Sequence, residues 1–116
     1  MLTKEEIKTL ERDGYLALGQ LLTADEVKAV NDKIEELIND EGEKAGSELF
    51  ESKYIRHPKE EGADRLADLV NKGSIFDKFY TDHRVLAAIT AVLGEHFKLS
   101  SLNYRAAKPG DRKSVV

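Results

Sequence analysis

The segment 23–40 reads TADEVKAVNDKIEELIND and carries the clearest structural signal in the chain. Thr23 and Glu26 fit a capping box, in which each side chain accepts a hydrogen bond from the backbone N–H of the other residue. Behind them, apolar residues recur every three or four positions, namely Val27, Val30, Ile34, Leu37 and Ile38. The pattern predicts an amphipathic helix over 24–40 that ends at Gly42.

The same signal occurs once more toward the N-terminus. Thr3 and Glu6 form a second capping box, and Ile7 and Leu10 follow at helical spacing. Gly14 is a natural stop, so a short helix is expected over 4–13. The next residues, 15–18, form a brief extended run.

Beyond the long helix, the sequence from 43 to 73 mixes charges and glycine with isolated apolar residues. Connections of this length inside compact domains are usually functional or mobile. The apolar residues indicate a loop that packs against the rest of the domain. Within this loop, 64–70 predicts a short helix with Leu66, Leu69 and Val70 as its apolar residues.

Two further helices are expected before the pattern changes. A short one spans 74–80. A second one begins at Asp82 and ends at Gly94. Its apolar face consists of Val85, Leu86, Ile89, Val92 and Leu93.

The segment 98–107 has no helical stripe and precedes the turn signal Pro109-Gly110, so it predicts a strand. One face holds Phe97, Leu99, Ser101, Asn103 and Arg105, and the other holds Lys98, Ser100, Leu102 and Tyr104. Neither face is purely apolar, which leaves two interpretations open: an edge strand with a wet side, or a barrel strand that lines a polar pocket. A lone strand cannot satisfy its own backbone groups, so the fold is expected to be incomplete without further strands.

Composition narrows the class of protein. The 116 residues are 41% hydrophobic and 34% charged, which fits one small globular domain or a piece of a larger one. The net charge of −4 disfavours nucleic-acid binding, and the absence of cysteine excludes disulfides and thiolate chemistry. Neither a signal peptide nor an apolar run long enough to span a membrane is evident, so the expected location is the cytoplasm.

The sequence shows no local metal or catalytic motif. The three histidines, His57, His83 and His96, are far apart, and none begins a His-x-Asp or His-x-Glu sequence. A facial triad for iron needs two histidines and one carboxylate on one face, and this spacing does not predict one. Phosphate-binding loops, hydrolase nucleophile motifs and EF-hand loops are also absent.

Several short motifs nevertheless follow one another in a recognisable order. They are LTKEEI at 2–7, DGYL at 13–16, LLTADEV at 21–27, RHPKEE at 56–61, LVNKG at 69–73, DHRVL at 82–86, VLG at 92–94 and KPG at 108–110. Each motif is common by itself, but their order and spacing resemble the N-terminal part of phytanoyl-CoA dioxygenase family proteins. The resemblance covers nearly the whole chain.

This resemblance implies an α+β architecture in which residues 1–116 supply the N-terminal helices and first strand or strands of a double-stranded β-helix, or jelly-roll. Family members use iron(II) and 2-oxoglutarate to hydroxylate small organic molecules. They hold the iron with a His-x-Asp soon after the first strand and with a distant second histidine. Here the sequence after Pro109 contains no histidine. The chain alone is therefore expected to bind neither cofactor and to be inactive, and whether it is an enzyme stays open.

The resemblance also implies site residues. Leu102 and Tyr104 match positions on the inward face of the family's first strand, near 2-oxoglutarate and iron. An equally acceptable role for Tyr104 is packing against a helix. Arg65 and Asn71 match the region that precedes the substrate pocket.

Two other interpretations remain beside the oxygenase. The chain can be a stand-alone helical module that binds a partner through its apolar stripes, or a non-catalytic remnant that docks on another subunit. An incomplete fold would expose apolar surface, which predicts self-association. The identity of the substrate does not follow from the sequence.

Overall fold

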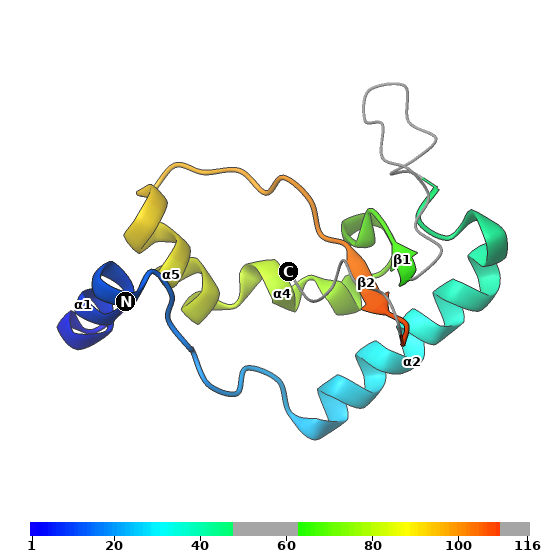
Figure 1. The fold of residues 1–116 in the computed structure, drawn as a ribbon, viewed down its shortest axis with the longest axis horizontal. Coiled ribbons are helices and arrows are strands. Elements are labelled where there is room, and N and C mark those ends of the chain that lie inside the picture. The colour runs from blue at the N-terminus through cyan, green and yellow to red at the C-terminus, as the bar shows by residue number, and fades with distance from the viewer. Residues whose placement is uncertain (48–62, 110–116) are drawn as a thin grey trace.

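The computed structural model describes residues 1–47 and 63–109, and it combines helices with a small antiparallel sheet (Figure 1). The α-helices are α1 (Lys4–Asp13), α2 (Ala24–Glu41), α4 (Lys78–Thr81) and α5 (His83–Leu93). The short 3-10 helices are η1 (Gly42–Lys44), η2 (Leu69–Asn71) and η3 (Ser74–Phe76), and the strands are β1 (Ala63–Leu66) and β2 (Tyr104–Ala107). The predicted α+β class is confirmed for the described residues, which do not form a jelly-roll by themselves.

Helices α1 and α2 begin as their capping boxes predict. The backbone N–H of Glu26 donates to Thr23 Oγ1 at 3.1 Å, and the N–H of Thr23 donates to Glu26 Oε1 at 2.9 Å. Thr3 and Glu6 make the same pair of bonds at the start of α1. Helix α1 ends at Gly14 in the left-handed region, and α2 extends one residue beyond the prediction.

The region predicted as a helix over 64–70 forms strand β1 followed by η2, so that prediction is wrong. Asp68 has a left-handed backbone with φ of 56°, a conformation that a continuous α-helix does not allow. Residues before it pair with β2 instead, and the N–H of Leu69 donates to the carbonyl of Leu102 at 3.0 Å. The gain of strand hydrogen bonds outweighs a helical preference that is weak over so few residues.

Strand β2 is shorter than the predicted strand over 98–107, because regular pairing covers only Tyr104–Ala107. Its partner is β1, in an antiparallel register that places Leu66 opposite Tyr104 and Arg65 opposite Arg105. The strand predicted to be alone thus finds a neighbour within the same chain. The sheet remains two-stranded in the described part of the chain.

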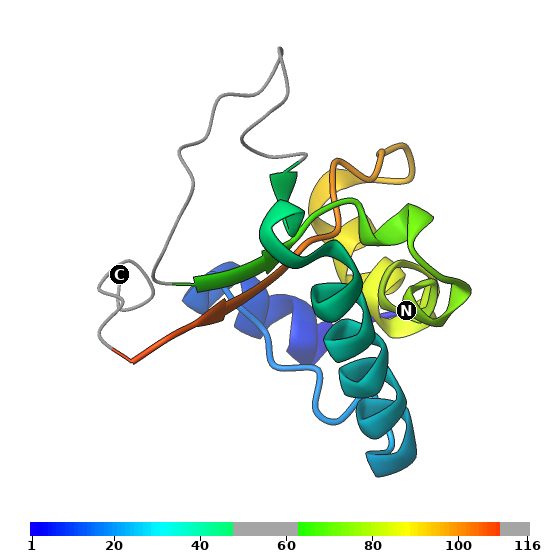
Figure 2. The ribbon, with the colours of Figure 1, turned by 90° about the vertical axis from the view of Figure 1, so that its right-hand side faces the viewer.

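The core lies where α2 meets the sheet and the segment that leads into α4. Leu66 and Phe76 are fully buried, and Leu69 and Val30 complete the buried cluster. The residues packed around them are partly buried, namely Ile34, Leu37, Ile38, Ala45, Ile75, Phe79, Leu102 and Tyr104. Figure 2 shows α2 running beside the two strands, which is the arrangement that this core requires.

Helix α5 begins and ends as predicted. Asp82 is its N-cap and accepts from the N–H of Arg84 at 2.9 Å, and Gly94 follows its last residue. The helix predicted over 74–80 is divided into η3 and α4. None of the helices in the described residues is long and apolar enough to cross a membrane.

Helix α1 lies apart from this core. None of its residues is buried, and Figure 1 shows it next to α5, at the opposite end of the molecule from the sheet. An extended linker over 14–22 connects α1 to α2 and contains no regular secondary structure. The brief extended run predicted over 15–18 forms part of this linker.

Candidate functional site

The two residues predicted near the cofactor are Tyr104, the first residue of β2, and Leu102, which lies two residues before it. Both are partly buried and pack against the cluster that contains Leu66 and Phe76. Tyr104 therefore packs against the core, in line with the second role that the sequence allowed for it. A role of either residue near 2-oxoglutarate stays a prediction.

The two residues predicted for the substrate pocket lie in different places. Arg65 belongs to β1 and alternates with the buried Leu66, so its side chain projects from the opposite face of the sheet. Asn71 is exposed at the end of η2, where its Nδ2 donates to both carboxylate oxygens of Asp68 at 2.9 and 3.1 Å. Arg65 and Asn71 lie on different elements, and neither lines the cavities described below, so their assignment to a substrate pocket stays a prediction.

The face of the sheet opposite the core carries a pair of arginines, of which the sequence analysis named only Arg65 as a site residue. Arg65 lies directly opposite Arg105 in the register of the two strands. Directly opposed residues in an antiparallel pair have neighbouring Cβ atoms, so both arginine side chains start side by side on the same face of the sheet. Alternation along 98–107 had already placed Arg105 on the other face from Tyr104, but only the pairing with β1 adds Arg65.

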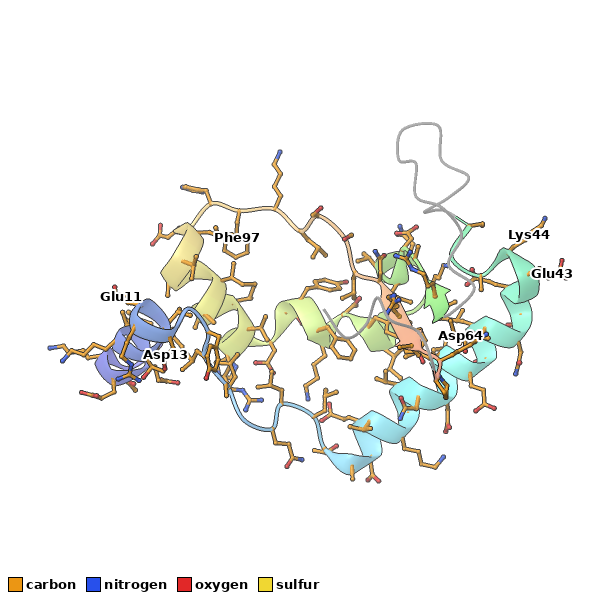
Figure 3. The ribbon with its side chains drawn as sticks, viewed as in Figure 1. Glu11, Asp13, Glu43, Lys44, Asp64 and Phe97 are labelled. Atoms are coloured by element: carbon orange, nitrogen blue, oxygen red, sulfur yellow. The ribbon has the colours of Figure 1, made fainter. Side chains whose placement is uncertain are left out.

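Gly46 covers part of this arginine face. A Cβ atom at Gly46 would lie 3.1 Å from the Cβ of Arg65 and 3.2 Å from its carbonyl oxygen. Gly46 is buried and has φ of 76°. The close backbone approach explains why Arg65 is only partly exposed although it points away from the core. Asp64 of β1, which alternates with Arg65 and so lies on the other face of the sheet, forms an ion pair with Lys108 at 3.3 Å, and Figure 3 labels Asp64.

The described residues contain no cluster suited to a metal ion. No three histidine, aspartate or glutamate side chains converge within residues 1–47 and 63–109. His83 is the first residue of α5, His96 lies in the exposed connection to β2, and His57 lies outside the described residues. This part of the chain therefore does not fit the ligand set of an iron site.

A second polar group lies between the linker and α5. Asp82 accepts two hydrogen bonds from the Arg84 guanidinium, from Nε at 3.4 Å and from Nη2 at 3.3 Å. These bonds are the main cause of a lowered pKa at Asp82, the backbone N–H of Arg84 adds to the effect, and burial opposes it. Arg84 also donates to the linker, through Nη1 to the carbonyl of Gln20 at 3.2 Å and through Nη2 to that of Leu21 at 3.5 Å.

Comparison with known proteins gives one informative similarity. The chain is 28% identical over 89 residues to ectoine dioxygenase of Streptomyces coelicolor. The aligned part covers 77% of this chain but only 28% of that enzyme, so the chain spans less than a third of the length of this relative. No family model and no solved structure matches the sequence. The similarity supports the broad oxygenase group to which the sequence motifs pointed.

Proposed function

We propose that this chain is the N-terminal part of an iron(II)- and 2-oxoglutarate-dependent oxygenase of the phytanoyl-CoA dioxygenase family, which hydroxylates a small organic molecule. The observation that carries the proposal is the similarity to ectoine dioxygenase over 77% of the chain. The α+β architecture, with helices before and beside a short sheet, is compatible with the start of such a fold.

The two faces of the sheet indicate which residues could point toward a substrate in the proposed enzyme. Helix α2 and the core cover the face that holds Leu102 and Tyr104. In a jelly-roll, the other face of such a sheet turns toward the interior, where small substrates bind. Arg65 and Arg105 project from that other face, and guanidinium groups bind carboxylates with good geometry. The face that carries Arg65 and Arg105 is thus a second candidate for the pocket side, beside the face with Leu102 and Tyr104.

The iron ligands of the proposed enzyme must come from outside the described residues. Residues 1–47 and 63–109 offer no converging set of three ligands. In this proposal the described part has two roles. Its helices form a packed layer that supports the sheet, and one polar face of the sheet contributes to the substrate pocket. The 28% coverage of the ectoine enzyme is consistent with most of the catalytic residues being elsewhere.

The test begins with the gene. The reading frame should continue beyond codon 116 into a segment that encodes a His-x-Asp motif. The longer protein is then incubated with iron(II), 2-oxoglutarate and oxygen, and succinate is measured with a panel of small molecules that includes ectoine. We expect succinate from the longer protein and none after the motif histidine is replaced by alanine. A stop codon directly after Val116, with no succinate from the 116-residue chain, would contradict the proposal.

A second candidate function, a helical binding module, is favoured by one specific observation. The end of α5 and the connection after it expose several large apolar side chains: Val92 at 65%, Leu93 at 63%, Leu99 at 50% and Phe97 at 36%. Figure 3 shows Phe97 beside the end of α5. These residues lie close together in the chain, and apolar side chains that gather on one surface often mark an interaction site. Sedimentation of the chain should detect self-association that Leu93→Lys weakens, and a strictly monomeric chain at all concentrations would count against this candidate.

A further inference from the structure

A cavity of about 370 Å³ lies between the linker, the start of α2 and the junction of α4 with α5. It is separate from the sheet and from Arg65 and Arg105. Its lining consists of Gly19, Gln20, Leu21, Leu22, Val27, Lys78, Phe79, Asp82 and Val85. A smaller cavity of about 130 Å³ continues beside it and shares Leu22, Lys78 and Phe79 with it.

The apolar character of the cavity follows from the stripe of α2. Val27 is the first member of that stripe, yet it is 42% exposed, whereas Val30, one turn further, belongs to the buried core. Val85, from the first turns of α5, and Phe79, from α4, line the same space. The core ends before it reaches Val27, so these apolar side chains face the cavity instead of one another.

The charged groups at the rim are matched in pairs. Lys78 forms an ion pair with Glu26, and Asp82 forms one with Arg84 at 3.3 Å. The hydrogen bond from Lys78 is the main cause of a lowered pKa at Glu26, so the Glu26 carboxylate stays charged near neutral pH. A charged ligand would have to break one of these pairs, whereas an uncharged apolar molecule would not.

The linker wall of the cavity is held in place from α5. Arg84 donates to the carbonyls of Gln20 and Leu21, and Asp82 holds the guanidinium from its other side. Within the linker, Gln20 Nε2 donates to the carbonyl of Leu22 at 2.7 Å. These bonds fix the backbone of a segment that has no regular secondary structure, which gives the cavity a defined outer wall.

We infer that this cavity is a binding site for a small, uncharged apolar molecule, such as a one- or two-ring aromatic compound, with the Arg84-bound linker as its outer wall. The volume is at the lower end of the range for small-molecule sites, about 300–1,000 Å³. Burial of Val27, Val85 and Phe79 against the ligand supplies the favourable free energy. The inference concerns a site other than the arginine face and does not depend on oxygenase activity.

The test uses indole as the probe and methyl NMR of the 116-residue chain with labelled leucine and valine. Saturable shifts are expected at the methyls of Leu22, Val27 and Val85. Val27→Gln places a polar group at a position that is already exposed, so the fold should tolerate it, and it should weaken indole binding at least about fivefold. Thr90→Gln, at an exposed position of α5 that does not line the cavity, is the control and should leave the affinity unchanged.

A third variant, Arg84→Lys, tests the linker wall, because lysine cannot donate to both carbonyls and to Asp82 with the same planar geometry. It should weaken indole binding and shift the Leu22 methyl signals in the free protein. The inference is overturned if indole shifts do not saturate, or if they centre on Leu93 and Leu99. Equal indole affinities for wild type and Val27→Gln would overturn it as well.

Discussion

Leu66 lies directly opposite Tyr104 in the antiparallel sheet, and both side chains pack into the core that Val30 and Phe76 complete. Each strand has only four residues, so the ladder contributes few hydrogen bonds. Two-stranded sheets are marginally stable in water unless another element packs on them. The packing of this pair against α2 is therefore what holds the two remote segments together.

Replacement of Leu66 by alanine tests this arrangement. Because the leucine is fully buried, Leu66→Ala should lower the free energy of unfolding by about 2–5 kcal/mol, measured by urea denaturation. Val92→Ala is the control, since Val92 is 65% exposed and should cost less than about 0.5 kcal/mol. Similar losses in the two variants would mean that the core does not centre on the sheet.

Helices α1, α2 and α5 could be predicted from the sequence because their signals are local. The bonds that start α2 join Thr23 and Glu26, three residues apart, and the stripe behind them needs no information from elsewhere. The same holds for α1 and for Asp82 at the start of α5. Their predicted bounds agree with the structure to within one residue.

Strand β1 could not be predicted in this way. Its sequence, Ala-Asp-Arg-Leu, has no alternation of apolar and polar residues, and its partner β2 is remote in the chain. What selects the strand is burial of Leu66 and a left-handed turn at Asp68, and both depend on tertiary contacts.

The candidate site was only partly predictable for a related reason. Alternation placed Leu102 and Tyr104 on one face and Arg105 on the other, as the structure confirms for β2. Which face meets the helices depends on the position of α2, which alternation does not encode. The neighbour of Arg105, Arg65, follows from the register of a strand pair that the sequence did not reveal.

The two capping boxes should differ in their effect on stability. Thr23→Ala removes an acceptor from α2, which packs on the core, and should lower the free energy of unfolding by about 1 kcal/mol. Thr3→Ala removes the same bond from α1, which buries no residue, so it should loosen α1 locally with little effect on global unfolding. Urea denaturation measures the first effect, and amide hydrogen exchange in α1 measures the second. Equal global losses would indicate that α1 belongs to the cooperative core.

Gly46 and Gly14 form another matched pair, since both have φ near the same positive value, 76° and 78°. Gly14→Ala meets no atom within 4 Å and should cost only the left-handed backbone penalty, about 1–2 kcal/mol. Gly46→Ala adds a Cβ at 3.1 Å from Arg65 Cβ and 3.2 Å from its carbonyl oxygen, so its loss should be larger. Denaturation of both variants gives the comparison. A smaller loss for Gly46→Ala would show that its approach to β1 is not close in solution.

Asp82 should make stability depend on acid pH. Hydrogen bonds from Arg84 lower its pKa from the ordinary value of 3.8, so Asp82 stabilises the folded chain above that value. This contribution should be lost as the pH falls through the lowered pKa, because the unfolded chain, in which Asp82 has the higher pKa, takes up the proton more readily than the folded chain. Asp82→Asn keeps an N-cap acceptor for α5 but cannot titrate.

The difference in unfolding free energy between wild type and Asp82→Asn should therefore be large at about pH 6 and shrink toward about pH 2. Urea denaturation across this range measures it, and the comparison cancels titration of Glu26 and other carboxylates. Parallel curves for the two proteins would show that the Asp82–Arg84 contact contributes nothing to folding.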